Sequence, residues 1–149
     1  GACGYGEDKA IFGYGYDGTH YSMTNLVSNL GVVATDTTGV GQVRRALTAC
    51  GYGGDKGIFA YGYTGSANTT ISNLVSNVGV VATDVSGVGT AHNAGSSASY
   101  GGDKGIFGFG SGYTAVTNLV SNLGVVGSNV TGVGTAREGS AAAGYSNSA

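Results

Sequence analysis

The segment Asp8-Lys9-Ala10-Ile11-Phe12-Gly13-Tyr14-Gly15 decides the fold, because the chain contains it three times. It returns at Asp55-Lys56-Gly57-Ile58-Phe59-Ala60-Tyr61-Gly62 and at Asp103-Lys104-Gly105-Ile106-Phe107-Gly108-Phe109-Gly110, at offsets of 47 and 48 residues. Two other markers recur in the same order. Asn-Leu-Val-Ser-Asn begins at Asn25, Asn73 and Asn118, and Gly-Val-Gly begins at Gly39, Gly87 and Gly132. Three markers in one order at one period indicate a tandem repeat. We expect one repeat domain over residues 1–149, with units at about 3–49, 50–98 and 99–143 and a tail at 144–149.

Each unit is expected to contain four short antiparallel strands. In the first unit these are the segment that begins at Lys9, the segment at 25–28, the segment at 32–35 and the segment at 42–49. Asn-x-Gly loops and Asp-x-x-Gly turns separate them. The sequence therefore predicts an all-β fold of three tandem four-stranded antiparallel repeats, arranged like propeller blades or as stacked sheets.

Aromatic residues alternate with small residues in the repeated strand. Side chains of a strand alternate between its two faces, which predicts rings on one face and glycine on the other. Neighbouring sheets can then stack with the rings in the space that glycine leaves. The predicted repeat-core residues are Phe12, Phe59, Phe107, Tyr14, Tyr61 and Phe109.

Three blades are too few to close a propeller, since closed examples usually have about four to eight. Copies of the chain are therefore expected to complete a ring, or the units are expected to stack in a filament. The same strand pattern is compatible with a closed propeller, an open stack and a filament.

Composition narrows the class of partner. Charged residues make up 9% of the chain, and its six Lys and Arg residues form no basic patch, so we expect no binding of nucleic acid. No apolar stretch approaches the roughly 20 residues of a membrane-spanning helix, so no membrane span is expected. The chain begins with Gly1 rather than Met, which is typical of a processed product, a fragment or part of a longer protein.

The string from Tyr100 to Phe107, followed by Thr-Asn-Leu-Val-Ser-Asn and Gly-Val-Gly-Thr-Ala-Arg, resembles repeats of tail-fibre and virion structural proteins of aquatic bacteriophages. The resemblance covers essentially the whole chain. It implies a repetitive, glycan-facing virion appendage without enzymatic activity. The expected location is the virion or an extracellular cell surface, and the expected partners are copies of the chain or neighbouring fibre chains.

The acidic residue of each Asp-Lys pair is expected to start the strand or cap the turn before it. These residues are Asp8, Asp55 and Asp103. Adjacent strand residues point to opposite faces, so each Asp is expected to face the Lys of a neighbouring unit rather than its own. A row of ligand-binding or metal-binding carboxylates is the alternative.

Cys3 and Cys50 occupy the same place in consecutive units, with Ser99 taken as the third position. A disulfide between them, a bond between chains and two buried thiols are all compatible with the sequence. Neither His20 nor His92 is repeated, and no spacing typical of a catalytic triad, a zinc site, a phosphate loop or a calcium loop occurs. We therefore expect no catalytic residue, metal or cofactor.

Three tyrosines follow the aromatic strands and are candidate glycan-binding residues: Tyr16, Tyr63 and Tyr113. Exposed Tyr rings can pack on sugars, and a row of them would give multivalent binding. Sealing the edge of the core is their alternative role. The sequence thus predicts a non-enzymatic structural module of a virion appendage or extracellular fibre, with a lectin-like module for glycans or receptors as the alternative.

Overall fold

Three antiparallel sheets, one from each repeat, make up the protein. The structure is a computed structural model, and it describes residues 1–145. The first sheet contains β1 (Ala2–Tyr5), β2 (Lys9–Tyr16) and β3 (His20–Val27). The second contains β4 (Thr48–Tyr52), β5 (Lys56–Ala60) and β6 (Ser72–Val75), and the third contains β7 (Ser96–Tyr100), β8 (Lys104–Gly108) and β9 (Thr117–Val120). In each sheet the strands pair in chain order.

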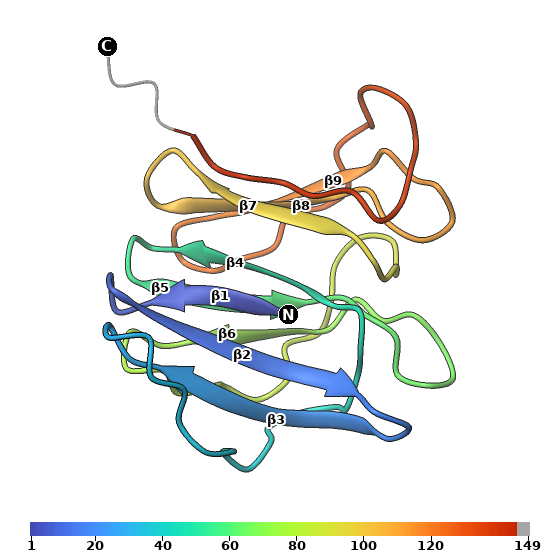
Figure 1. Cartoon of the computed structure of the whole chain (residues 1–149). Coiled ribbons are helices and arrows are strands. Elements are labelled where there is room, and N and C mark those ends of the chain that lie inside the picture. Colours follow the sequence, from blue (N-terminus) through green and yellow to red (C-terminus); the bar gives the residue numbers. More distant parts are fainter. Residues whose placement is uncertain (146–149) are drawn as a thin grey trace.

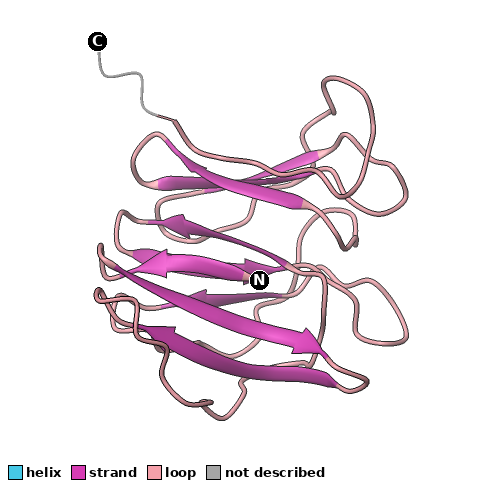
Figure 2. Ribbon diagram, in the orientation of Figure 1, coloured by secondary structure: helices cyan, strands magenta, loops and turns pink. Residues whose placement is uncertain are grey.

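The sheets lie on top of one another in a row, with the first sheet at the bottom and the third at the top (Figure 1). The all-β prediction is confirmed, and Figure 2 shows strands and loops without a helix in the described part of the chain. The arrangement is the stacked-sheet alternative, since the described sheets form neither a closed barrel nor a closed propeller ring. Residues 1–145 also contain no helix that could cross a membrane.

The prediction of four strands per unit is not confirmed. The segment at 32–37 returns to β3 through only two isolated bridges, Thr24 to Thr37 and Val27 to Val33. Between these bridges the Asn25 side chain donates a hydrogen bond to the Ala34 carbonyl. A side-chain hydrogen bond therefore replaces part of the main-chain hydrogen bonding of a regular strand pair. The expected fourth strand at 42–49 is also wrong, because Thr48 already begins the first strand of the next sheet. Unit boundaries placed at residues 50 and 99 therefore fall inside β4 and β7, and the expected tail lies outside the described residues beyond residue 145.

Each sheet has an upper face, turned toward the next sheet, and a lower face, turned toward the preceding one. In the first sheet Cys3, Ile11 and Leu26 lie in register on the upper face, and Phe12 and Asn25 lie in register on the lower face. Two clusters of buried side chains form the core, one at each junction between sheets. The upper face of one sheet and the lower face of the next contribute to each cluster.

The aromatic residues of the repeated strand do not all share one face, contrary to the prediction. Phe59 and Phe107 lie on lower faces and are fully buried, whereas Phe12 on the first sheet is 50% exposed. Tyr14 has a φ of 62°, and the β2–β3 register shifts between Gly13 and Gly15. This bulge breaks the alternation and turns the Tyr14 ring to the upper face, where it meets Phe59 edge-on at a centroid distance of 5.3 Å.

The same left-handed backbone occurs at the equivalent positions, Tyr61 and Phe109, with φ values of 61° and 62°. Tyr61 contacts the Phe107 ring at 5.5 Å in the same edge-on geometry. Glycine does make room for rings, as expected, since a Cβ built on Gly13 would lie 2.8 Å from Cζ of Phe59. Each junction is therefore filled by a Phe from above and a ring from the bulge below.

Candidate functional site

The most elaborate polar arrangement lies at the first junction, between the first and second sheets. The Arg44 side chain is fully buried and lies over the Tyr14 ring, with Cζ 4.3 Å from the centroid. Its Nη2 donates to Oδ1 of Asn73 at 2.6 Å, and its Nη1 lies 4.0 Å from the Asp84 carboxylate. Burial lowers the pKa of Arg44, although an Arg side chain stays protonated in proteins.

Asp84 belongs to the second unit and binds the main chain of the first unit. Its carboxylate accepts from the Gln42 amide at 3.0 Å and from Nδ2 of Asn73 at 2.9 Å. Asn73 also donates to the Ala82 carbonyl at 3.0 Å. The buried amide is thereby satisfied on both sides, as a buried polar side chain requires.

The second junction contains a neutral version of the same arrangement. His92 replaces the arginine and stacks on Tyr61 at a centroid distance of 4.1 Å. Asn129 replaces the aspartate, and its Oδ1 accepts from the Thr90 amide at 3.1 Å. Burial lowers the pKa of His92, which favours its uncharged form.

His92 is not repeated as a histidine, but its position in the unit is a repeated one. Arg44, His92 and Arg137 each lie five residues after the first glycine of a Gly-Val-Gly marker. Each also bonds the carbonyl two residues earlier, and each covers the ring of the bulge in its own unit. A search for identical residues does not find this position, because its residue type differs between units, but its constant spacing from the Gly-Val-Gly marker does.

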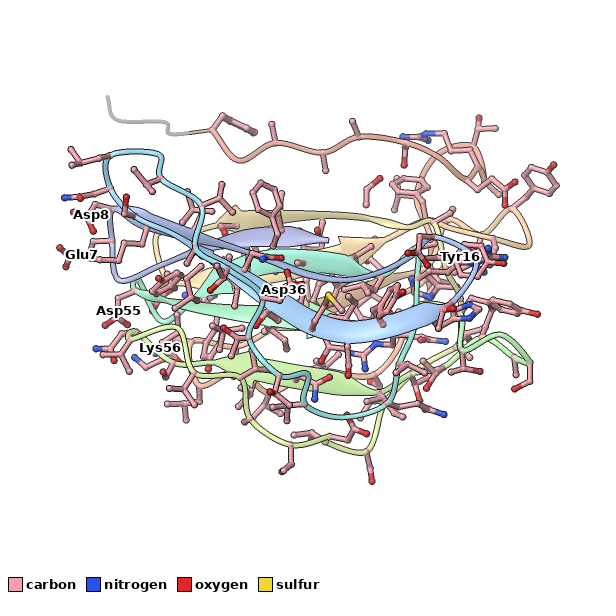
Figure 3. The ribbon with its side chains drawn as sticks, turned by 60° about the horizontal axis from the view of Figure 1, so that its bottom comes forward. Glu7, Asp8, Tyr16, Asp36, Asp55 and Lys56 are labelled. Atoms are coloured by element: carbon pink, nitrogen blue, oxygen red, sulfur yellow. The ribbon has the colours of Figure 1, made fainter. Side chains whose placement is uncertain are left out.

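Asp8, Asp55 and Lys56 lie at one edge of the stack, far from Tyr16 (Figure 3). Each Asp lies in the turn before the strand that its Lys begins. Lys9, Lys56 and Lys104 bind the Asp directly before them at 2.7, 2.7 and 2.8 Å. The expected pairing between units is wrong, because the Asp belongs to the turn and does not follow strand alternation. The hydrogen bond from Lys lowers the pKa of each Asp.

Cys3 and Cys50 are free and buried, so the structure has the two-thiol alternative rather than the disulfide. Burial raises the pKa of each to about 12. The equivalent residue in the third sheet is Ala98 rather than Ser99, because it pairs with Ile106 as Cys50 pairs with Ile58. Each sulfur lies against a glycine of the next sheet: a Cβ on Gly57 would lie 2.5 Å from the Cys3 Sγ.

Two of the three candidate glycan-binding tyrosines lie together. Tyr16 and Tyr63 flank His20, with centroid distances of 4.7 and 6.2 Å. Arg45 lies over both phenol rings, 4.4 Å from Tyr16 and 5.4 Å from Tyr63. The His20 Nε2 is buried and has no hydrogen-bond partner among the described residues.

Tyr113 is 69% exposed but does not belong to this row. Counting from the bulge, Ser111 is the equivalent of Tyr16 and Tyr63. The Ser111 hydroxyl accepts from Asn68 and from the Asn93 amide. A three-membered row of tyrosines is therefore not formed, and within residues 1–145 the cluster of Tyr16, His20 and Tyr63 has no counterpart at the second junction.

Among residues 1–145 no group of three His, Cys, Asp or Glu side chains could hold a metal ion. In comparisons with known proteins, no family model and no curated protein matches this chain. The fold and the polar junctions define an all-β tandem-repeat protein whose units are joined through buried side chains.

Proposed function

We propose that the chain is a non-enzymatic structural module that assembles through its repeated β units into a virion appendage or an extracellular fibre. The observation that carries the proposal is the exposure of apolar side chains on the two outermost sheets. Phe12, on the lower face of the first sheet, is 50% exposed, whereas the same residue in the other sheets is fully buried. On the third sheet Leu119 and Tyr100 are 42% and 38% exposed. Apolar surface of this kind at both ends favours further association.

The resemblance to phage tail-fibre repeats supports the proposed location on a virion or cell surface. The mass of the native particle tests the proposal, with light scattering for mass and negative-stain microscopy for shape. We expect rings or fibres of many copies. A monodisperse particle of 14.5 kDa at every concentration would contradict assembly. An antibody against the chain that labels neither phage particles nor cell surfaces would contradict the location.

A lectin-like module is the second candidate function, and the cluster of Tyr16, His20, Arg45 and Tyr63 is the observation that favours it. Phenol rings offer flat apolar surfaces to a sugar, and a guanidinium offers several hydrogen-bond donors. A glycan array tests this function. Tyr16→Ala and Tyr63→Ala should each abolish binding, whereas Tyr113→Ala is the matched control because that exposed ring lies outside the cluster. An array without a positive signal would remove this candidate.

A further inference from the structure

The two outer faces of the stack are the two halves of one junction. Every internal junction packs an upper face, with Ile11 or Ile58 fully buried, against a lower face, with Phe59 or Phe107 fully buried. The outer lower face carries the half-exposed Phe12. The outer upper face carries a hollow, which is lined on the sheet side by Ala98, Tyr100, Ile106 and Leu119 and on the other side by residues 143–145 of the same chain.

The polar residues at the two ends also match one another. At the first junction Arg44 lies 4.0 Å from the Asp84 carboxylate, whereas the second junction has His92 in place of the arginine and Asn129 in place of the aspartate. Residue type has thus changed on both sides at once. The third unit presents Arg137 at this position, and the first unit presents Asp36, so the ends restore the arginine–aspartate pair.

Asp36 lies on the first-sheet side of the stack, which comes forward in Figure 3. It accepts from Nδ2 of Asn25 at 2.8 Å, as Asp84 accepts from Asn73. At the opposite end Arg137 lies 3.9 Å over the Phe109 ring, as Arg44 lies over Tyr14. Each end therefore already holds its half of the pair in the geometry that the first junction uses.

The small residues that meet between neighbouring sheets also differ in a matched way at the two ends of the stack. Both internal junctions place a cysteine sulfur against a glycine, with a built Cβ on Gly57 or Gly105 only 2.5 Å from the sulfur. The first sheet has Ala10 at the glycine position, and the third has Ala98 at the cysteine position. At both glycines the sulfur is the atom that a Cβ would meet most closely, so Ala10 fits a neighbouring sheet with alanine at the cysteine position better than one with cysteine.

At the internal junctions, atoms of the neighbouring unit occupy the space beside two turn glycines, and at the two ends of the stack that space is empty. A Cβ on Gly41 or Gly89 would meet Asp84 or Asn129 of the next unit, whereas one on Gly134 meets nothing within 4 Å. On the opposite faces, a Cβ on Gly79 would lie 2.8 Å from Leu26 of the preceding unit, and one on Gly31 meets nothing within 4 Å.

From these matches we propose that a second copy of this chain places its first sheet on the third sheet of the first copy, repeating the internal junction. This inference rests on the proposed function and names the partner and the contact. Phe12 of the second copy enters the hollow over Ile106, and its Asp36 meets Arg137. Because the contact is head-to-tail, it leaves one free face of each kind and continues as an open stack.

A segment of the same chain, residues 140–145, competes for this face. It runs along β7 at the top of the stack in Figure 1, where a fourth unit would place its first strand. Its sequence Ala142-Ala143-Gly144-Tyr145 matches Ala2-Cys3-Gly4-Tyr5 at three of four positions. β1 is paired with β2 over four residues, whereas this segment is not part of a sheet and is held through Ser140 and Ser96. Docking therefore displaces the segment and keeps β1.

Charge reversal across the contact tests the stack, with sedimentation velocity over a range of protein concentrations as the measurement. Arg137→Asp and Asp36→Arg should each weaken self-association roughly tenfold or more, because like charges then meet in a desolvated contact. Mixing the two variants, or combining both changes in one chain, should restore it. Glu7→Lys is the matched control, since its equivalent Gly54 has nothing within 4 Å of a built Cβ even in the middle unit.

Restoration on mixing also shows that both variants fold, and circular dichroism checks each alone. Assembly that neither reversal weakens would overturn the end-to-end contact but leave the proposed structural function in place. A wild-type chain that stays monomeric at all concentrations would overturn both. Weakening without restoration would overturn the direct pairing of Arg137 with Asp36.

An apolar pair of variants gives a second test that does not depend on charge pairing. Phe12→Asp should abolish stacking, because the carboxylate would enter the hollow over Ile106. Leu30→Asp should not, since Leu30 is 84% exposed and its equivalent Val78 stays 69% exposed between two neighbouring sheets. Equal effects of the two changes would overturn the proposed contact.

Displacement of the competing segment has its own test. A Cβ on Gly144 would lie 2.5 Å from the Ser99 carbonyl oxygen, so Gly144→Ala should loosen the segment and strengthen association several-fold. Gly127→Ala is the control, because its Cβ meets only the Leu119 carbonyl at 3.5 Å. Weaker association of the Gly144 variant would mean that the segment belongs to the junction, and displacement would be wrong.

Discussion

Adding one methyl group at Gly57 should destabilise the protein, and removing the neighbouring sulfur as well should cost less than the sum of the two separate changes. The built Cβ lies 2.5 Å from the Cys3 Sγ and 3.1 Å from the Gly4 carbonyl oxygen, so Gly57→Ala overpacks the first junction. Overpacking of a dense core typically costs about 1–3 kcal/mol. Cys3→Ala alone removes one buried group and should cost about 1 kcal/mol.

In the double variant the new methyl occupies the space of the sulfur. The alanine pair is the combination that the chain already carries at residues 10 and 98, on its two outer faces. We expect the free energy of unfolding of the double variant to exceed the additive value by at least about 0.5 kcal/mol.

Urea unfolding of the wild type, both single variants and the double variant measures this coupling. Gly127→Ala corrects for the general effect of replacing glycine on the unfolded chain, because its Cβ meets only an ordinary contact at 3.5 Å. Losses that add within about 0.3 kcal/mol would refute the direct contact between sulfur and glycine.

Three other measurements test the junctions. Phe59→Ala should lower the free energy of unfolding in urea by about 3–5 kcal/mol, because Phe59 is fully buried. Phe12→Ala should lower it clearly less at concentrations where the chain is monomeric, because Phe12 is 50% exposed. Equal losses would contradict the stacked core. Burial raises the pKa of Cys3 and Cys50 to about 12, so above pH 9.0 the unfolded thiols release protons that the folded ones retain. Stability should therefore fall by about 1.4 kcal/mol per pH unit and thiol between pH 9.0 and about 12, and the double Cys→Ala variant should show a shallower fall in pH-dependent unfolding. Burial lowers the pKa of His92, so stability should decline as the pH falls below 6.5 and the unfolded state takes up a proton; His92→Gln should show a weaker decline in the same titration.

The repeat itself could be predicted from the sequence, because three markers at one spacing leave few alternatives to equivalent units. Strand type and the turns before Lys9, Lys56 and Lys104 also follow from local patterns. The number of strands could not be predicted in this way. An Asn side chain, which is buried in the second and third units, holds the returning segment, and composition does not distinguish that from a fourth strand.

The face of each aromatic residue was predicted wrongly because one residue departs from extended geometry. Tyr14, Tyr61 and Phe109 have positive φ values although they are not glycine, so their rings turn to the opposite face from Phe12 and its equivalents. Sequence alone gives little sign of this, since large side chains seldom adopt that backbone. The polar junction residues were missed for another reason: similarity between units draws attention to identical residues, whereas here matched differences carry the information.

Those matched differences give the stack an order. One junction contains Arg44 and Asp84, and the next contains His92 and Asn129 at the equivalent positions. Exchanging the second and third units would place Arg44 against Asn129 and Arg137 against Asp84, and it would leave His92 at the free end opposite Asp36. Units that share a backbone are therefore not interchangeable, because the residue type at this one position determines which neighbouring unit each can match.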